Sequence, residues 1–163
     1  MANLMGIDIG SGGCKIVVIN SSGEVMSRKY REIETNYPHP GWAEQDPRDW
    51  ENALRELLPL ALSEADVQAR DISCITISAA THSVVLLDKR GKVLRPAILW
   101  TDRRTIEETE WLKRHFADMI IDETYHAPNV NWTLPYLLWV RTHEPQVLRE
   151  VHKILMPKDY SVF

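Results

Sequence analysis

The residues best suited to chemistry stand together near the start of the chain, in the segment Gly6-Ile7-Asp8-Ile9-Gly10-Ser11-Gly12-Gly13-Cys14-Lys15. One carboxylate, Asp8, is followed at once by a glycine-rich bend, and apolar runs on both sides predict two strands. Glycine lets backbone N–H groups approach an anion closely and tolerates the positive φ of an anion-binding nest. Because a carboxylate repels an anion unless a cation lies between them, the pattern indicates a phosphate together with Mg²⁺. The segment therefore predicts a hairpin that handles a nucleotide.

Two better-known phosphate loops do not fit this segment. A P-loop runs as Gly-x-x-x-x-Gly-Lys-Ser/Thr into a helix, whereas Lys15 follows Cys14 and precedes a β-branched run. A dinucleotide-binding fingerprint counted from Gly10 has Lys15 in place of its third glycine. An ordinary glycine-rich β-hairpin, with Asp8 buried or solvated, is the alternative interpretation of the same residues.

Composition narrows the class of protein. The 163 residues predict one domain with a genuine core, and the net charge of −4 argues against nucleic acid or an anionic membrane as a partner. Cys14 and Cys74 lie far apart in strand-like runs, so both are expected to be buried, reduced thiols of a cytoplasmic protein. Without a leader-like segment or an apolar run of about 18 residues, we expect neither export nor a membrane span.

The elements that must position these side chains follow an α/β pattern. Strands are predicted over residues 4–9, 14–20, 25–33, 71–78, 84–88 and 93–100, the fourth of them central in a sheet. Helices are predicted from residue 47 and over 102–115, 134–143 and 145–155. Asp46 and Pro47 mark the first helix start, and Pro59 predicts a kink or a break inside that helix. A last helical start at Pro157 is soon cut off, so the chain is expected to be a fragment.

Four ordered stretches resemble the N-terminal third of the FGGY family of carbohydrate kinases, in the actin–hexokinase–Hsp70 superfamily, and are most similar to xylulokinases. They are the glycine-rich hairpin, residues 38–47, residues 98–104, and residues 132–139 together with 144–145 and 155–160. The resemblance implies that residues 1–163 form part of a ribonuclease-H-like, actin-like ATPase domain, with a mixed sheet and flanking helices. This domain would bind the sugar, and the C-terminal domain that binds ATP would be absent.

The resemblance also implies a reaction, the transfer of the ATP γ-phosphoryl group to a hydroxyl of D-xylulose or a related ketose. Asp8 would then act through Mg²⁺. The phosphates would be faced by backbone amides of the bend, those of Gly10, Ser11, Gly12 and Gly13. Lys15 is expected either to support the phosphates or to be a solvated strand residue. The catalytic base would lie beyond Phe163, so the chain alone is expected to be inactive.

On the sugar side, the resemblance implies six substrate contacts, namely Thr81, His82, Trp100, Asp102, Arg103 and Asn131. Thr81 and His82 follow a strand end, where open α/β sheets bind ligands. A structural role for His82 and a helix cap for Asp102 are the alternative interpretations. The segment Ala79-Ala80-Thr81-His82 departs from the family's Gly-Gln-Met-His, and Ser83 is closer to gluconokinases, so a gluconokinase-type substrate is an alternative.

Two other classes of protein stay open at this point. One is a non-catalytic sugar-binding or interaction fragment, and the other is a different actin-like ATPase, against which the segment Trp42–Pro47 argues. Partners are expected to be a small sugar and, for a full-length protein, a second copy in a homodimer. The remaining side chains receive structural interpretations: histidines without zinc spacing (His39, His115, His126, His143, His152), core tryptophans (Trp50, Trp111, Trp139) and a solvated helix face (Glu107, Glu108, Glu110).

Overall fold

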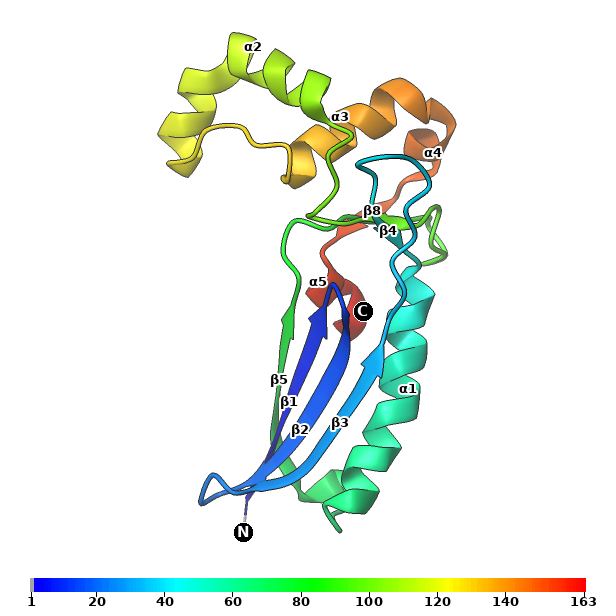
Figure 1. Ribbon diagram of the computed structural model, residues 1–163, viewed down its shortest axis with the longest axis vertical. Helices are drawn as coiled ribbons and strands as arrows, with labels where there is room; N and C mark the ends of the chain where they lie inside the picture. The colour runs from blue at the N-terminus through cyan, green and yellow to red at the C-terminus, as the bar shows by residue number, and fades with distance from the viewer. Residues whose placement is uncertain (1) are drawn as a thin grey trace. The chain divides into compact units, whose positions relative to one another are not determined.

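The computed structural model describes residues 2–163, which form two compact units where the chain length predicted one domain. The first unit comprises the residues up to 35 with 46–80 and 157–163, and the second comprises 36–45 and 81–156. In chain order (Figure 1) the elements are β1 (Asn3–Gly10), β2 (Gly13–Asn20), β3 (Val25–Glu32), β4 (Glu44–Gln45), α1 (Pro47–Glu64), a 3₁₀ turn (Ala69–Asp71), β5 (Ile72–Ala79), β6 (Val85–Leu87), β7 (Ala97–Ile98), α2 (Ile106–Thr124), α3 (Thr133–His143), α4 (Pro145–Glu150), β8 (Lys153–Leu155) and α5 (Pro157–Val162).

The first unit is a four-stranded mixed sheet in the order β3-β2-β1-β5, with α1 packed on β2 and β3 (Figure 1). β1 and β2 form the hairpin that the sequence predicted, and β3 pairs antiparallel with β2. β5 runs parallel to β1, with Ile77 opposite Ile7. The prediction of a central strand is wrong for residues 2–163, because β5 pairs on one side only and leaves Ile75 55% exposed.

Helix α1 begins as the sequence predicted. The side chain of Asp46 accepts the Arg48 N–H, and Pro47 occupies the first turn, where its missing N–H costs nothing. Pro59 does not break the helix, which continues to Glu64. Since Pro59 is exposed, the carbonyl that it leaves without a donor can be hydrated by water.

The two cysteines differ. Cys14 of β2 is buried, as predicted, between the sheet and α1. Cys74 is exposed, contrary to the prediction, because it belongs to the edge strand β5. Strand-like sequence alone did not distinguish a strand covered by a helix from a strand at an edge.

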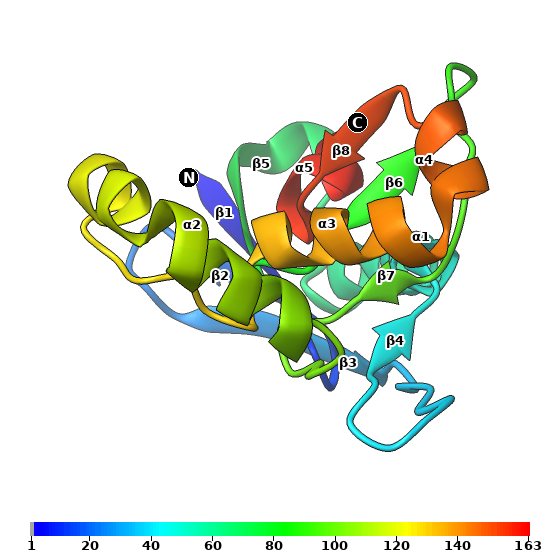
Figure 2. The same ribbon diagram turned by 90° about the horizontal axis from the view of Figure 1, so that it is seen from above.

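The second unit contains α2, α4 and short strand pairs that pack against α3 (Figure 2). β4 pairs with β7, β6 pairs with β8, and single bridges join Leu87 to Val93 and Val84 to Ile98. The segments predicted as strands over 84–88 and 93–100 therefore lie antiparallel and are joined by these bridges. The core of the unit combines apolar side chains of the strands and α3, namely Val84, Leu86, Ile98, Tyr136, Trp139 and Val140.

Two predicted helices of this unit differ from the structure. The helix predicted over 145–155 ends at Glu150, because Val151 adopts extended backbone angles and residues 153–155 pair with β6 instead. α2 begins at Ile106 and continues to Thr124, where Tyr125 ends it with φ +58°. None of the helices within residues 2–163 combines the length and apolarity that a membrane crossing requires.

The structural interpretations of single residues are confirmed in part. Trp50 and Trp139 are buried, whereas Trp111 is 39% exposed and is not a core residue. Glu107 and Glu110 are exposed, as expected of a solvated helix face. Glu108 is different, since its side chain is 11% exposed and approaches His143 of α3 to 3.5 Å.

Candidate functional site

The residues expected to bind phosphate all lie in the first unit, four of them at the turn between β1 and β2 and Lys15 in β2. Gly10 pairs with Gly13, and Ser11 and Gly12 form the two-residue turn between them. None of these four residues has a positive φ, so the expected nest conformation is not present. The turn is braced by Tyr30 of β3, whose hydroxyl donates to the Gly12 carbonyl over 2.8 Å.

Two glycines that flank this turn differ in how much space surrounds them. A Cβ atom on Gly13 would lie 2.4 Å from the Arg31 carbonyl oxygen and 2.6 Å from the Tyr30 hydroxyl, which is too close for any other residue. A Cβ atom on Gly10 would make ordinary contacts, 3.7 Å from the Gly13 carbonyl and 3.8 Å from Asp8 Oδ2. Gly13 is therefore required for the packing of β2 on β3, whereas a small side chain at Gly10 would fit beside the Asp8 carboxylate.

Asp8 projects from the sheet face opposite to the apolar core. Its neighbours Ile7 and Ile9 are buried, and Asp8 itself is exposed, as strand alternation requires. Within residues 2–163 its carboxylate forms no hydrogen bond or ion pair, not even with Lys15 directly opposite on β2. Burial and, as the smaller cause, the negative charge of Asp8 raise the pKa of the Cys14 thiol to about 11.

This arrangement fits a magnesium ion that is held mainly by a nucleotide. Mg²⁺ keeps several waters and usually takes one or two carboxylates together with substrate phosphates. Over residues 2–163 there is no group of three or more side chains that could hold a metal alone, whereas Asp8 offers one free carboxylate. Asp8 is thus suited to complete the coordination of an ion that arrives with its phosphates.

The residues expected to bind sugar all lie in the second unit. His82 is the centre of a γ-turn, in which the Ser83 N–H donates to the Thr81 carbonyl over 2.8 Å and His82 has φ +58°. The γ-turn with positive φ is rare and strained, and strained residues concentrate at functional sites. The His82 ring stacks on Trp132, with ring centroids 6.0 Å apart and planes 19° from parallel.

Ser83 connects two of the expected sugar contacts. Its N–H closes the His82 turn, and its hydroxyl accepts the Trp100 N–H over 3.2 Å. Ser83 is fully buried, while the Trp100 side chain is 41% exposed. From the sequence, Ser83 was noted only for its similarity to gluconokinases. Its positioning role was missed because a turn with positive φ at a histidine leaves no sequence signal.

Arg103 and Asn131 form a second connected pair. Arg103 Nη1 donates to Asn131 Oδ1 over 3.1 Å, and the Arg103 backbone N–H donates to the Gly41 carbonyl. Arg103 is exposed, so its guanidinium remains accessible. Of the six expected sugar contacts, five are therefore at least partly accessible: Thr81, His82, Trp100, Arg103 and Asn131.

Asp102 is the exception, and its expected contact with a sugar is corrected by the structure. Its carboxylate is fully buried and accepts four hydrogen bonds, one from the Ala43 N–H at 2.6 Å and three from Arg104 at 2.8–3.0 Å. A carboxylate offers about four acceptor positions, so none is left for a ligand. The alternative of a helix cap is also wrong, because Thr105 is the N-cap of α2.

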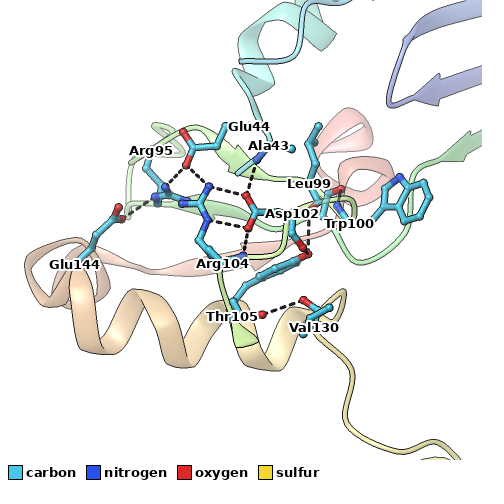
Figure 3. Close-up of polar contacts among 12 residues, drawn as sticks. Ala43, Glu44, Arg95, Leu99, Trp100, Asp102, Arg104, Thr105, Val130 and Glu144 are labelled. Carbon is cyan, nitrogen blue, oxygen red and sulfur yellow. Dashed lines mark hydrogen bonds and ion pairs between the residues drawn. The ribbon is translucent and has the colours of Figure 1, made fainter. Parts of the chain in front are cut away.

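Asp102 belongs to a buried ionic network (Figure 3). Arg104 pairs with Asp102 and with Glu44, Glu44 pairs with Arg95, and Arg95 pairs with Glu144. The Arg104 guanidinium also lies 3.8 Å from the ring centre of Trp42 and 4.8 Å from that of Trp139. The Tyr136 hydroxyl donates to the Leu99 carbonyl over 2.9 Å, and burial raises the pKa of this phenol.

Three of the four stretches that resemble the kinase family supply side chains to this network or to its contacts. Residues 38–47 supply Trp42 and Glu44, residues 98–104 supply Asp102 and Arg104, and residues 132–139 with 144–145 supply Tyr136, Trp139 and Glu144. These side chains join β4, the turn after β7, and α3. Much of the recurring sequence therefore specifies the second unit's structure, and fewer of its residues are free to contact a ligand.

Comparison with known proteins defines the class to which this fold and site belong. The domain described as "FGGY family of carbohydrate kinases, N-terminal domain" matches residues 3–163. Xylulose kinase of Escherichia coli (strain K12) is 36% identical over 157 residues, which are 96% of this chain and 32% of the enzyme. The chain therefore belongs to the FGGY family of carbohydrate kinases.

Solved structures agree with the family. The crystal structure of xylulose kinase from Rhodospirillum rubrum matches with a TM-score of 0.91 and 28% identity, covering 98% of this chain and 34% of that one. Gluconate kinase from Lactobacillus acidophilus has the same fold, with a TM-score of 0.92 and 23% identity over 99% of this chain and 32% of that chain. The chain spans about a third of the length of the relatives that it matches.

Proposed function

We propose that this chain is the sugar-binding part of an ATP-dependent kinase that phosphorylates a hydroxyl of D-xylulose or a related ketose. The observation that carries the proposal is the match of residues 3–163 to the N-terminal domain of FGGY carbohydrate kinases, with a xylulose kinase 36% identical over almost the whole chain. The free carboxylate of Asp8 beside Gly10 supports it, because phosphoryl transfer depends on charge neutralisation and positioning. The cytoplasm is its proposed location.

The chain's own residues would perform two tasks in this reaction. In the first unit, Asp8 would hold the magnesium of MgATP, which supplies the phosphoryl group when bound. The amides of the β1–β2 turn and Lys15 would face the phosphates. In the second unit, His82, Trp100 and the Arg103–Asn131 pair would orient the sugar. The general base would come from sequence beyond residue 163, so the isolated chain would bind without transferring phosphate.

A coupled assay of the full-length protein with ATP and Mg²⁺ tests the proposal. The sugar panel should contain D-xylulose, D-ribulose, gluconate and glycerol, and we expect the highest kcat/KM for D-xylulose. A preference for gluconate would favour the gluconokinase-type alternative suggested by Ser83. Absence of turnover on every sugar would overturn the kinase proposal and favour a non-catalytic sugar-binding fragment.

The same assay separates the two sets of residues. His82→Ala should raise the KM of the sugar more than that of ATP, because His82 would contact the sugar. Equal effects on both values would remove His82 from the sugar site. Residues 1–163 alone should show no turnover, and turnover by this chain that disappears in Asp8→Ala would contradict the inference of a missing base.

A further inference from the structure

Two histidine rings of the second unit contact the indole of Trp132. His82 lies near-parallel to the indole, with centroids 6.0 Å apart, and His126 meets it edge-on at 5.9 Å with planes 90° apart. Over residues 2–163, the ring nitrogens of His82, His126 and Trp132 have no hydrogen-bond partner. Their donors and acceptors are therefore unused by the fold.

The backbone fixes where His126 and Trp132 stand. Tyr125 ends α2 with φ +58°, and the His126 N–H that follows donates to Thr124 Oγ1 over 3.3 Å. At the other end of the loop, the hydroxyl of the fully buried Thr105 donates to the Val130 carbonyl over 2.9 Å (Figure 3). Trp132 is the N-cap residue of α3, and its own N–H donates to the Asn129 carbonyl.

The two histidines contact the Trp132 indole in different orientations. His82 covers a face of the indole, whereas His126 makes a perpendicular contact, the arrangement that ring quadrupoles favour alongside offset stacking. A perpendicular neighbour restrains rotation of the indole plane. Trp132 is half-buried, and within residues 2–163 its indole forms ring contacts with His82 and His126 but no hydrogen bond, so these ring contacts orient its side chain.

We propose that His126 is a positioning residue for the sugar site, acting through Trp132. This inference rests on the proposed function, because it assigns to the loop of residues 125–132 one wall of the sugar-binding site. His126 holds the indole parallel to His82, so that the ring edges present N–H and imidazole nitrogens to the hydroxyls of the polyol while apolar ring surface meets its C–H groups. Small-molecule sites combine apolar lining with a few fixed polar groups in this way.

Loss of His126 should weaken sugar binding selectively. His126→Ala frees the Trp132 side chain, and re-ordering one such side chain on binding corresponds to about a threefold to tenfold rise in the Kd and KM of D-xylulose. The KM of ATP and the Tm should stay unchanged. His126→Phe keeps a ring edge without the nitrogens and should restore sugar binding to near the wild-type value.

A matched control exists on α2, where His115 stacks on Trp111 with centroids 5.0 Å apart. His115→Ala removes a comparable histidine–tryptophan contact and should leave sugar and ATP constants unchanged. These constants and the Tm would be measured on the full-length protein, with sugar binding followed by calorimetry. An unchanged sugar Kd in His126→Ala, or a His126→Phe variant as weak as His126→Ala, would overturn the positioning role. Failure of the wild-type protein to bind any sugar would overturn the proposed function as well, so the two failures are distinguishable.

Discussion

Asp8 and Asp102 begin from the same sequence context and end in opposite environments. Each is an acidic residue in or just after a strand, within a stretch that resembles a kinase motif. Asp8 is exposed and has no hydrogen bond or ion pair within residues 2–163, whereas Asp102 is fully buried and accepts four hydrogen bonds. The donors that the fold supplies, and not the motif, decide whether a carboxylate remains available to a ligand.

The largest loss of stability is expected when the buried ion pair between Asp102 and Arg104 is broken. The side chain of Arg104 is 0% exposed and neutralises both Asp102 and Glu44. Arg104→Met would leave these carboxylates without that charge, and breaking a buried ion pair from one side costs about 3–5 kcal/mol. Chemical denaturation of the chain should show this loss in the free energy of unfolding.

The neighbouring residue provides the control for Arg104. Arg103 is exposed and its side chain makes one hydrogen bond, to Asn131, so Arg103→Met should change the free energy of unfolding by only about 0.5 kcal/mol or less. A similar loss for both variants would show that the network around Asp102 does not carry the stability assigned to it.

The second largest loss of stability is expected at Gly13, and it tests whether Gly13 and Gly10 differ in the space available for a side chain. Gly13→Ala would place a Cβ atom 2.4 Å from the Arg31 carbonyl, and such overpacking costs about 1–3 kcal/mol. Gly10→Ala, with its nearest contact at 3.7 Å, should cost less than 1 kcal/mol. Equal costs in thermal unfolding would contradict the distinction between a packing glycine and an open one.

The contrast between Asp8 and Asp102 also shows which features of the fold and the site can be predicted from the sequence. Strands β1, β2 and β3, the start of α1 at Asp46 and helix α3 were predictable, because they depend on local alternation, caps and helical spacing. The edge position of β5 and the change from α4 to β8 depend on pairing with distant segments. At the site, His82 and Trp100 are accessible and their contacts with a sugar stay predictions, whereas Asp102 was misassigned because its donors are Ala43 and Arg104, the first of them 59 residues away.

A third carboxylate, that of Glu64 in α1, is exposed like Asp8 but has hydrogen-bonding partners like Asp102. Hydrogen bonds from Lys29 and then Ser27 of β3 lower the pKa of Glu64 from 4.5 to about 2. Because the folded-state pKa is depressed, this stabilisation is present above pH 4.5 and is lost as the pH falls toward 2. Glu64→Gln should make the free energy of unfolding less dependent on pH between 4.5 and 2.

Glu56→Gln is the matched control for Glu64, since it removes one exposed ion pair, with Arg31, from the same helix. The two variants should be compared by urea denaturation at a series of pH values. If the Glu64→Gln and wild-type profiles are parallel over this interval, the link between β3 and Glu64 is not formed in solution.

The smallest effect on stability is expected at Asp8 itself. Asp8→Asn removes a charge that has no hydrogen bond or ion pair among the described residues, so the free energy of unfolding should change by about 0.5 kcal/mol or less. Asp102→Asn, the same chemical change, should destabilise the chain by several-fold more, because it leaves the buried Arg104 facing an amide. In the full-length protein, Asp8→Asn should instead abolish phosphoryl transfer while sugar binding persists, which calorimetry with D-xylulose would show. A chain that unfolds on Asp8→Asn would place Asp8 beside Asp102 as a structural carboxylate, and the magnesium role would then lose its physical basis.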